Sequence, residues 1–161
     1  MKIKILLLLF LIAIIPMITE AQQTDNLFNT KGIRIVIPFN NCSSDTFLES
    51  GPGFSAWIEY NGRVIVFDTC SDYHTLLENM TKLKLDYNRV SDIFISHNHR
   101  DHVYGIPGVT SVKGFQVNTF IPKTSVDAIA QQIPRLKITA VDTFKELYPD
   151  IWTTGELSPV F

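Results

Sequence analysis

The sequence predicts an α/β domain, and three observations carry that prediction. Apolar segments at 56–60 and 63–67 flank Asn61-Gly62, which is the strongest short-range hairpin signal because both turn residues tolerate positive φ. Residues 72–83 then carry apolar side chains at helical spacing, and a short apolar segment follows at 92–95. The second hairpin strand, the helix and the segment 92–95 therefore form a β-α-β unit, which joins parallel strands through a right-handed crossover.

The remaining elements follow from the same patterns. A β-branched run predicts a strand at 33–37, before a polar loop at 39–52. Beyond the β-α-β unit, the patterns predict strands at 115–121, 137–141 and 151–154 and a short helix at 125–132. The chain shows no internal repeat, low-complexity tract or interdomain linker, so residues 22–161 are expected to form a single domain.

The first 21 residues have the pattern of a secretory signal peptide. Two lysines precede an apolar run at 5–18, and a small residue, Ala21, marks the expected cleavage point. The apolar run is shorter than the roughly 20 residues of a spanning helix, and Pro16 interrupts it. The protein is therefore predicted to be exported, to the periplasm or the exterior, without a stable membrane anchor after cleavage.

Charge and cysteine content limit the choice of partners. The chain has 14 Lys and Arg against 16 Asp and Glu, a net charge of −2. No basic cluster appears, so a nucleic-acid partner is not predicted. The two cysteines, Cys42 and Cys70, could pair in an oxidising compartment or remain as two separate thiols. A zinc role for Cys70 is a further alternative, because Cys70 follows Asp68 closely.

The segment His97-Asn98-His99-Arg100-Asp101-His102 is the most informative in the chain, since it holds three of the four histidines. Alternate residues beyond a strand point the same way, so His97 and His99 can converge on one ion. After a turn, Asp101 and His102 can face a second ion. Imidazoles and a carboxylate are the donors that zinc prefers. The alternative is a solvated loop with scattered histidines.

Asp68 is expected near this motif, because it follows the strand 63–67. The carboxyl ends of neighbouring parallel strands meet at one edge, where open α/β sheets place their active sites. Asp68 could orient a metal-binding histidine by accepting its N–H, or cap the next turn. His74 and Arg100 are expected to face solvent, and Glu156 is expected to be an ordinary loop charge.

The six-residue motif resembles the HxHxDH signature of the metallo-β-lactamase superfamily of metal-dependent hydrolases. The flanking segments 49–56, 64–69 and 76–80 resemble the branch of the dihydropterin and β-ribofuranosylaminobenzene phosphate synthases, as does the segment 153–156. The similarity spans about residues 33–108.

This resemblance implies a four-layer αββα sandwich made of two similar halves, of which residues 22–161 would hold only the first. It implies two divalent ions, zinc or alternatively manganese or iron, with His97, His99, Asp101 and His102 as ligands. In the intact site a metal-bound hydroxide attacks a small-molecule ester, amide, lactone or phosphoester, and Asp101 also takes part in catalysis as a proton acceptor.

The chain departs from this family in several places. Cys70 and Tyr104 stand where the family usually has glycine, and no histidine follows His102, although the superfamily's first metal takes a third histidine from later in the chain. Whether this chain is itself an enzyme is therefore left open, and a complementary half or a second copy is an expected partner. The alternatives are a non-catalytic metal-binding or interaction domain and a pterin-related synthase or transferase.

Overall fold

The computed structural model describes residues 32–157. The chain divides into two units, Met1–Gly32 and Ile33–Phe161. The first unit, with the predicted signal peptide, lies almost entirely outside the described residues, and the fold is that of the second. Between residues 32 and 157, no helix is both long enough and apolar enough to cross a membrane.

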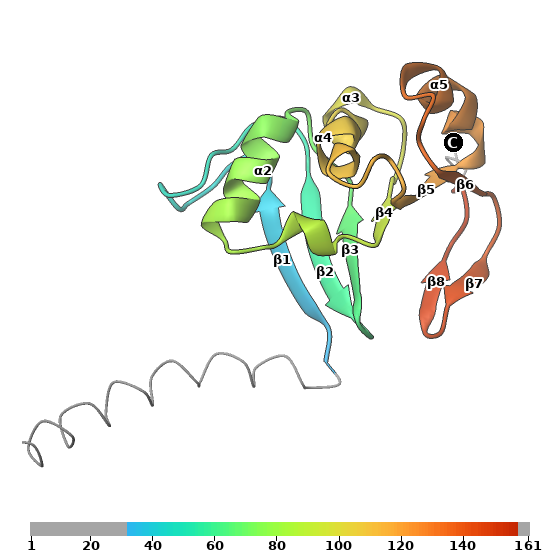
Figure 1. Ribbon diagram of the computed structural model, residues 1–161, viewed down its shortest axis with the longest axis horizontal. Coiled ribbons are helices and arrows are strands. Elements are labelled where there is room, and N and C mark those ends of the chain that lie inside the picture. The colour runs from blue at the N-terminus through green and yellow to red at the C-terminus, as the bar shows by residue number, and fades with distance from the viewer. Residues whose placement is uncertain (1–31, 158–161) are drawn as a thin grey trace, which may run out of the picture. The chain divides into compact units, whose positions relative to one another are not determined.

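A six-stranded mixed sheet organises the second unit, in the strand order β1-β2-β3-β4-β5-β6 (Figure 1). Its strands are β1 (Arg34–Phe39), β2 (Ser55–Tyr60), β3 (Arg63–Phe67), β4 (Asp92–Phe94), β5 (Asn118–Pro122) and β6 (Ile138–Val141). The pairs β1–β2 and β2–β3 are antiparallel, and the pairs from β3 to β6 are parallel. A separate antiparallel hairpin follows, with strands β7 (Lys145–Tyr148) and β8 (Ile151–Thr153).

Short helices connect the parallel strands. They are α2 (Tyr73–Lys82), α3 (Arg100–Val103), α4 (Ile106–Ser111) and α5 (Val126–Gln132), with 3-10 turns at Tyr87–Arg89 and Lys123–Ser125. Helix α2 begins after Asp72, whose carboxylate accepts the backbone N–H of His74, so Asp72 is an N-cap that satisfies a free donor of the first turn. This helix packs on β1 and against α4.

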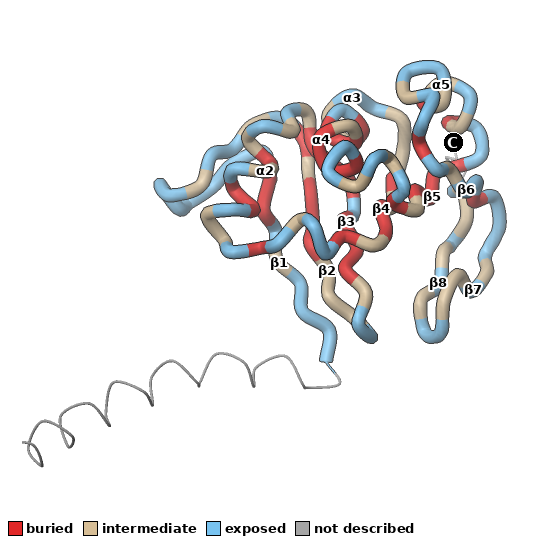
Figure 2. Tube along the Cα trace, viewed as in Figure 1, coloured by how far each residue is buried: buried red, intermediate tan, exposed pale blue. Residues whose placement is uncertain are grey.

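The hydrophobic core lies between the sheet and these helices. Trp57 and Val66 of neighbouring strands pair in register, and they are fully buried together with Ile93, Leu76 and Met80. Figure 2 shows the buried segments running along β2, β3, β4 and the inner sides of α2 and α4. Burial of each such side chain stabilises the fold by about 1.5–3 kcal/mol, so this face holds the domain together.

The opposite face of the sheet is only partly covered. Ile33, Ile35 and Ile37 are 44–60% exposed, and Phe67 is 36% exposed. These side chains leave apolar surface on this face of the sheet.

The predicted α/β class is confirmed, and so is the β-α-β unit, because β3 and β4 are parallel neighbours joined through α2. The Asn61-Gly62 turn is confirmed by positive φ angles of 47° and 75°. Strand β5 begins three residues later than predicted, because Phe115 adopts a φ of 66° and belongs to a turn. The helices α3 and α4 and the strand β7 were not predicted, since each is too short to show a periodic pattern.

A buried carboxylate ties the hairpin β7–β8 to the sheet. Asp92, fully buried in β4, accepts hydrogen bonds from Arg63 at 2.8 Å, Ser91 at 2.6 Å, Tyr148 at 2.7 Å and Asn118 at 3.1 Å. The Arg63 guanidinium also lies 3.3 Å from the Tyr148 ring centroid. Burial raises the pKa of Asp92, but these hydrogen bonds outweigh burial and hold its pKa below the ordinary value. Together these four partners satisfy the buried carboxylate of Asp92, and we call the five residues the Asp92 network.

We expect Asp92→Ala to lower the free energy of unfolding by about 3–5 kcal/mol, because it leaves the Arg63 charge without its buried partner. Since the folded-state pKa is depressed, the contribution of Asp92 is present above the unfolded pKa of about 3.9 and is lost as pH falls through the folded-state pKa. Urea unfolding between pH 3 and 7 measures both effects. The exposed carboxylate of Glu78, paired with Lys82, gives the control Glu78→Gln, which should cost about 0.5 kcal/mol or less. Equal stability of the two variants would contradict a structural role for the network.

Candidate metal centre

The histidine motif and Asp68 lie at one edge of the sheet. Asp68 directly follows β3 and Ser96-His97 follow β4, and these strands are parallel neighbours. The backbone continues the pairing beyond the strands, with Asp68 N donating to Phe94 O at 2.8 Å. The carboxyl ends of β3 and β4 therefore bring the two segments together, as the β-α-β prediction requires.

Asp68 is a buried acceptor for three hydrogen bonds. Its side chain accepts the backbone N–H of Ser96 at 2.8 Å, the Ser96 hydroxyl at 2.7 Å and His102 Nδ1 at 2.7 Å, while Asp68 is only 1% exposed. The carboxylate thus joins the end of β3 to the motif and fixes the His102 ring. With Nδ1 facing the carboxylate, Nε2 is the nitrogen of His102 that remains for a ligand.

The four motif side chains gather as two pairs of donor atoms. His97 Nε2 lies 3.0 Å from His99 Nδ1, and His102 Nε2 lies 3.6 Å from Asp101 Oδ2. The pairs are neighbours, because the ring centroids of His97 and His102 are 4.1 Å apart. The structure thus brings together all four residues that the sequence predicts as ligands.

The donor chemistry of these pairs fits divalent ions, with two protein ligands for each. Within residues 32–157, no group of three or more His, Cys, Asp and Glu side chains is arranged to hold one ion. Burial lowers the pKa of His97, and the neighbouring His102 and His99 lower it further. A lowered pKa favours the neutral imidazole, which is the form that binds metals.

Close backbone contacts fix the loop that carries the motif. A Cβ on Gly105 would lie 1.9 Å from the carbonyl oxygen of Thr69, and one on Gly53 would lie 2.0 Å from that of Asp101. Thr69 also donates to the His102 carbonyl oxygen, from its backbone N at 2.8 Å and from its hydroxyl at 2.9 Å. Glycine at position 105 therefore permits the close approach of the two backbones.

Both cysteines are free, with Cys42 exposed and Cys70 buried. The Cys70 thiol donates to the Asp72 carbonyl oxygen at 3.1 Å, and burial raises its pKa to about 12. The Cys70 thiol is therefore paired with a backbone carbonyl, and within residues 32–157 no group of three or more metal-binding side chains includes it. Cys70 has a φ of 54°. Glycine adopts a positive φ without strain, so it suits this position in the family that the sequence resembles.

The other candidates lie as the sequence suggests, with one exception. His74 is exposed at the start of α2, and Arg100 is exposed with its guanidinium 4.4 Å from the Tyr104 ring centroid. Glu156, expected to be an ordinary loop charge, instead lines a cavity beside His97. Its carboxylate accepts the backbone N–H of Thr124 at 3.1 Å and the Thr124 hydroxyl.

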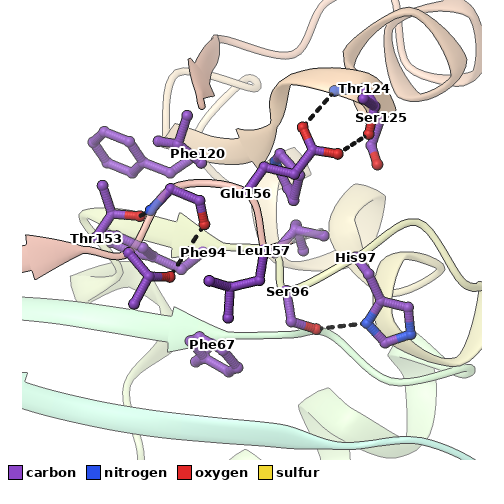
Figure 3. Close-up of a pocket in the computed structure, with 15 residues that line it drawn as sticks. Phe67, Phe94, Ser96, His97, Phe120, Thr124, Ser125, Thr153, Glu156 and Leu157 are labelled. Atoms are coloured by element: carbon purple, nitrogen blue, oxygen red, sulfur yellow. Dashed lines mark hydrogen bonds between the residues drawn. The ribbon is translucent and has the colours of Figure 1, made fainter. Parts of the chain in front are cut away.

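This cavity has a volume of about 340 Å³ and was not predicted (Figure 3). Its lining comes from the ends of β3, β4, β5 and β6 and from the segment 153–157, which follows the hairpin turn. Ser96 and His97 form the side toward the candidate metal ligands. Only the folded chain brings these distant segments together.

A mixed sheet with a histidine-rich motif beyond its parallel strands defines a metallo-β-lactamase type of fold. Residues 48–118 match the sequence model of the Metallo-beta-lactamase superfamily. A solved metal-dependent hydrolase of the beta-lactamase superfamily superposes with a TM-score of 0.57 at 20% identity, over 75% of this chain and 47% of that chain. The metallo-beta-lactamase fold protein YhfI of Bacillus subtilis superposes with a TM-score of 0.54 at 11% identity, over 73% of this chain and 49% of that chain. Residues 48–118 therefore match the metallo-beta-lactamase superfamily, and the fold of the described residues resembles that of its solved members.

Curated relatives are similar over shorter segments. Ribonuclease Z of Lactobacillus helveticus is 44% identical over 43 residues, which are 27% of this chain and 12% of the relative. Ribonuclease Z of Staphylococcus aureus strain JH9 is 35% identical over 68 residues, which are 42% of this chain and 21% of the relative. The chain thus spans about an eighth to a fifth of the length of these relatives. The resemblance to the pterin-related branch stays a prediction.

We expect Gly105→Ala to displace the motif loop, because the added methyl group meets the rigid backbone of Thr69. Overpacking of this kind costs about 1–3 kcal/mol or more. Gly114→Ala is the control, since Gly114 has a φ of 58° but no atom within 4 Å of its Cβ and should cost only about 1–2 kcal/mol of backbone strain. Histidine side-chain NMR signals report the loop directly. They should shift in the first variant and stay in place in the control, and unchanged signals in Gly105→Ala would disprove the close contact.

Thiol labelling should distinguish the two cysteines. We expect one fast-reacting thiol per native chain, from exposed Cys42, because Cys70 is buried with a pKa of about 12. Two thiols should react after denaturation. Mass spectrometry of the labelled peptides assigns each site, and native labelling of Cys70 at the rate of Cys42 would show that the buried environment is wrong.

Proposed function

We propose that this chain supplies part of a two-metal centre of a hydrolase. The observation that carries the proposal is the arrangement of the motif as two neighbouring pairs of donor atoms, with His102 held in place by buried Asp68. The donor atoms of the two pairs suit two divalent ions. Their grouping argues against the alternative of a solvated loop with scattered histidines. The whole centre then needs at least one further ligand for each ion, because a catalytic zinc normally has three protein ligands.

In this proposal His97 and His99 hold one ion, and Asp101 and His102 hold the other. Zinc is the first choice, with manganese or iron as alternatives. Ions held there would supply Lewis acidity to a substrate oxygen and lower the pKa of water. The Asp68 carboxylate stabilises the ring orientation of His102 through its 2.7 Å hydrogen bond with Nδ1. Asp101, whose side chain is 43% exposed, can accept a proton as well as bind.

The substrate we propose is a small molecule with a hydrolysable ester, amide, lactone or phosphoester bond. A nucleic-acid substrate is the second candidate, because the curated relatives are named ribonuclease Z. Phosphate backbones are bound through basic side chains. The chain has a net charge of −2, and Arg100, the cation within the motif, stacks on Tyr104. These charges favour the small molecule. From the predicted signal peptide we further propose that the protein acts outside the cytoplasm.

Metal uptake tests the centre directly. We expect the purified chain to bind zinc or manganese, and His99→Ala and His97→Ala to lose one ion, because each removes half of a ligand pair. Asp68→Asn should weaken binding by about 10–100-fold, as loss of an orienting partner typically does. His74→Ala is the matched control and should bind as the unmodified chain does. Equilibrium dialysis with elemental analysis gives the stoichiometry, and unchanged uptake in both motif variants would disprove the centre.

Hydrolysis tests the class of protein. With zinc or manganese present and the further ligands supplied by a complementary polypeptide, we expect turnover of a phosphodiester, a lactone, a β-lactam or an aryl ester, and its loss in Asp101→Asn together with one of the two ions. A completed centre that binds metal and turns over none of the four would favour the non-catalytic metal-binding alternative and contradict the hydrolase, whereas turnover only after the complementary polypeptide is added would place the missing ligands there.

A further inference from the structure

We propose that Ser96 is a positioning residue for the candidate metal centre, whose hydroxyl keeps a proton on Nδ1 of His97 and so leaves Nε2 of that ring free for an ion. This inference rests on the proposed function for its biological meaning, since the choice of ring nitrogen matters only where His97 binds a metal. The placement of the proton itself requires neither metal nor turnover, and it can be measured on the metal-free chain.

The Ser96 hydroxyl lies between two partners. Its Oγ is 2.7 Å from Asp68 Oδ2 and 2.9 Å from His97 Nδ1. Figure 3 shows the second contact as the dashed line between Ser96 and the His97 ring. The backbone N–H of Ser96 also donates to Asp68 Oδ1 at 2.8 Å. Ser96 is thus attached to the buried carboxylate at two points, which fixes the direction of its hydroxyl.

The number of protons decides which atom donates in each contact. A serine hydroxyl has one proton to donate, whereas an ionised carboxylate only accepts, so Ser96 is the donor toward Asp68. The hydroxyl then has no proton left for His97 and can only accept there. The proton of this second contact therefore belongs to His97 Nδ1. Because a neutral imidazole carries one N–H, Nε2 is the nitrogen of His97 with a free lone pair.

His102 shows the same arrangement without an intermediate residue. Its Nδ1 lies 2.7 Å from the same oxygen, Asp68 Oδ2, so this ring also carries its proton on Nδ1 and leaves Nε2 free. One carboxylate oxygen therefore sets both rings, that of His102 directly and that of His97 through Ser96. The two histidines belong to different ligand pairs, so Asp68 orients one ligand of each proposed ion.

The free nitrogen of His97 faces the other member of its pair. His97 Nε2 lies 3.0 Å from His99 Nδ1, a separation that lets both nitrogens reach one zinc ion at the usual distance of about 2.0–2.1 Å. A ring nitrogen that carries a proton cannot bind a metal. Without the Ser96 hydroxyl, His97 Nδ1 loses its acceptor and the proton is free to move to Nε2. His102 keeps its own hydrogen bond with Asp68, so the loss is confined to the pair of His97 and His99.

Nitrogen-15 NMR of the histidine side chains tests the proton placement in the full, metal-free chain with a chelator present. At about pH 8, above the ordinary histidine pKa of about 6.5, the rings are neutral and the two tautomers give different spectra. We expect His97 to be protonated on Nδ1. Ser96→Ala should move the proton population toward Nε2, and Ser96→Thr, which keeps the hydroxyl, should restore it. Ser111→Ala is the matched control, because it removes a hydroxyl that donates to the Gly108 carbonyl oxygen in α4.

Zinc titration by calorimetry tests whether the effect is confined to one ligand pair. In an Asp101→Ala background, where His97 and His99 remain as the complete pair, we expect Ser96→Ala to weaken zinc binding by about tenfold, as loss of an orienting partner typically does. Ser96→Thr should bind within about threefold of its parent, a difference under about 0.7 kcal/mol. In a His99→Ala background the pair of Asp101 and His102 remains, and Ser96→Ala should there change zinc binding by less than about threefold.

A proton on Nε2 of His97 in the unmodified chain would overturn the proposal, and so would an unchanged tautomer in Ser96→Ala. Equal losses in Ser96→Ala and Ser96→Thr, or equal losses in the two backgrounds, would show that Ser96 is only structural. A chain with the expected tautomers that takes up no metal would contradict the two-metal centre and leave the proton placement standing. The two failures are therefore distinguishable.

Discussion

The hydrogen bonds of buried Asp68 are the interaction on which the rest of the site depends. One carboxylate joins the end of β3 to Ser96 and His102, which follow β4. A buried carboxylate is costly unless its oxygens are fully used, so the three donors must stay in place for the fold to be stable. The same requirement fixes the orientation of His102. The same three hydrogen bonds therefore stabilise the edge of the sheet and set the geometry of the candidate metal centre.

The outer face of the sheet carries the Asp92 network and the cavity beside His97 at opposite ends of the parallel strands. Toward the amino ends of the parallel strands, the Asp92 network ties the hairpin β7–β8 down through Tyr148. Toward their carboxyl ends, Phe67, Phe94 and Phe120 line the cavity. The hairpin connects the two ends of this face, because Tyr148 lies in β7 and the segment 153–157 of the cavity lining begins in β8. Glu156 is held there by its own hydrogen bonds with Thr124.

The match to the superfamily model covers the motif but only part of the cavity. Residues 48–118 include Asp68 and all four candidate ligands. Phe120, Thr124 and the segment 153–157 lie beyond that range. The candidate ligands therefore lie in the part of the chain that matches the family model, and most of the cavity lining lies outside the matched range. This division agrees with the general finding that loops carry differences in function on a common scaffold.

The sequence by itself determined the α/β class, the hairpin at Asn61-Gly62, the β-α-β unit and the four candidate ligands. These features are local, since turn chemistry, hydrophobic period and ligand spacing are all read within a few residues. Tertiary structure alone decided that Cys70 is a buried thiol, that Glu156 faces a cavity and that Asp92 anchors a distant hairpin. Each of these depends on contacts between segments far apart in the chain, whose separation is set by packing and leaves no periodic trace in the sequence.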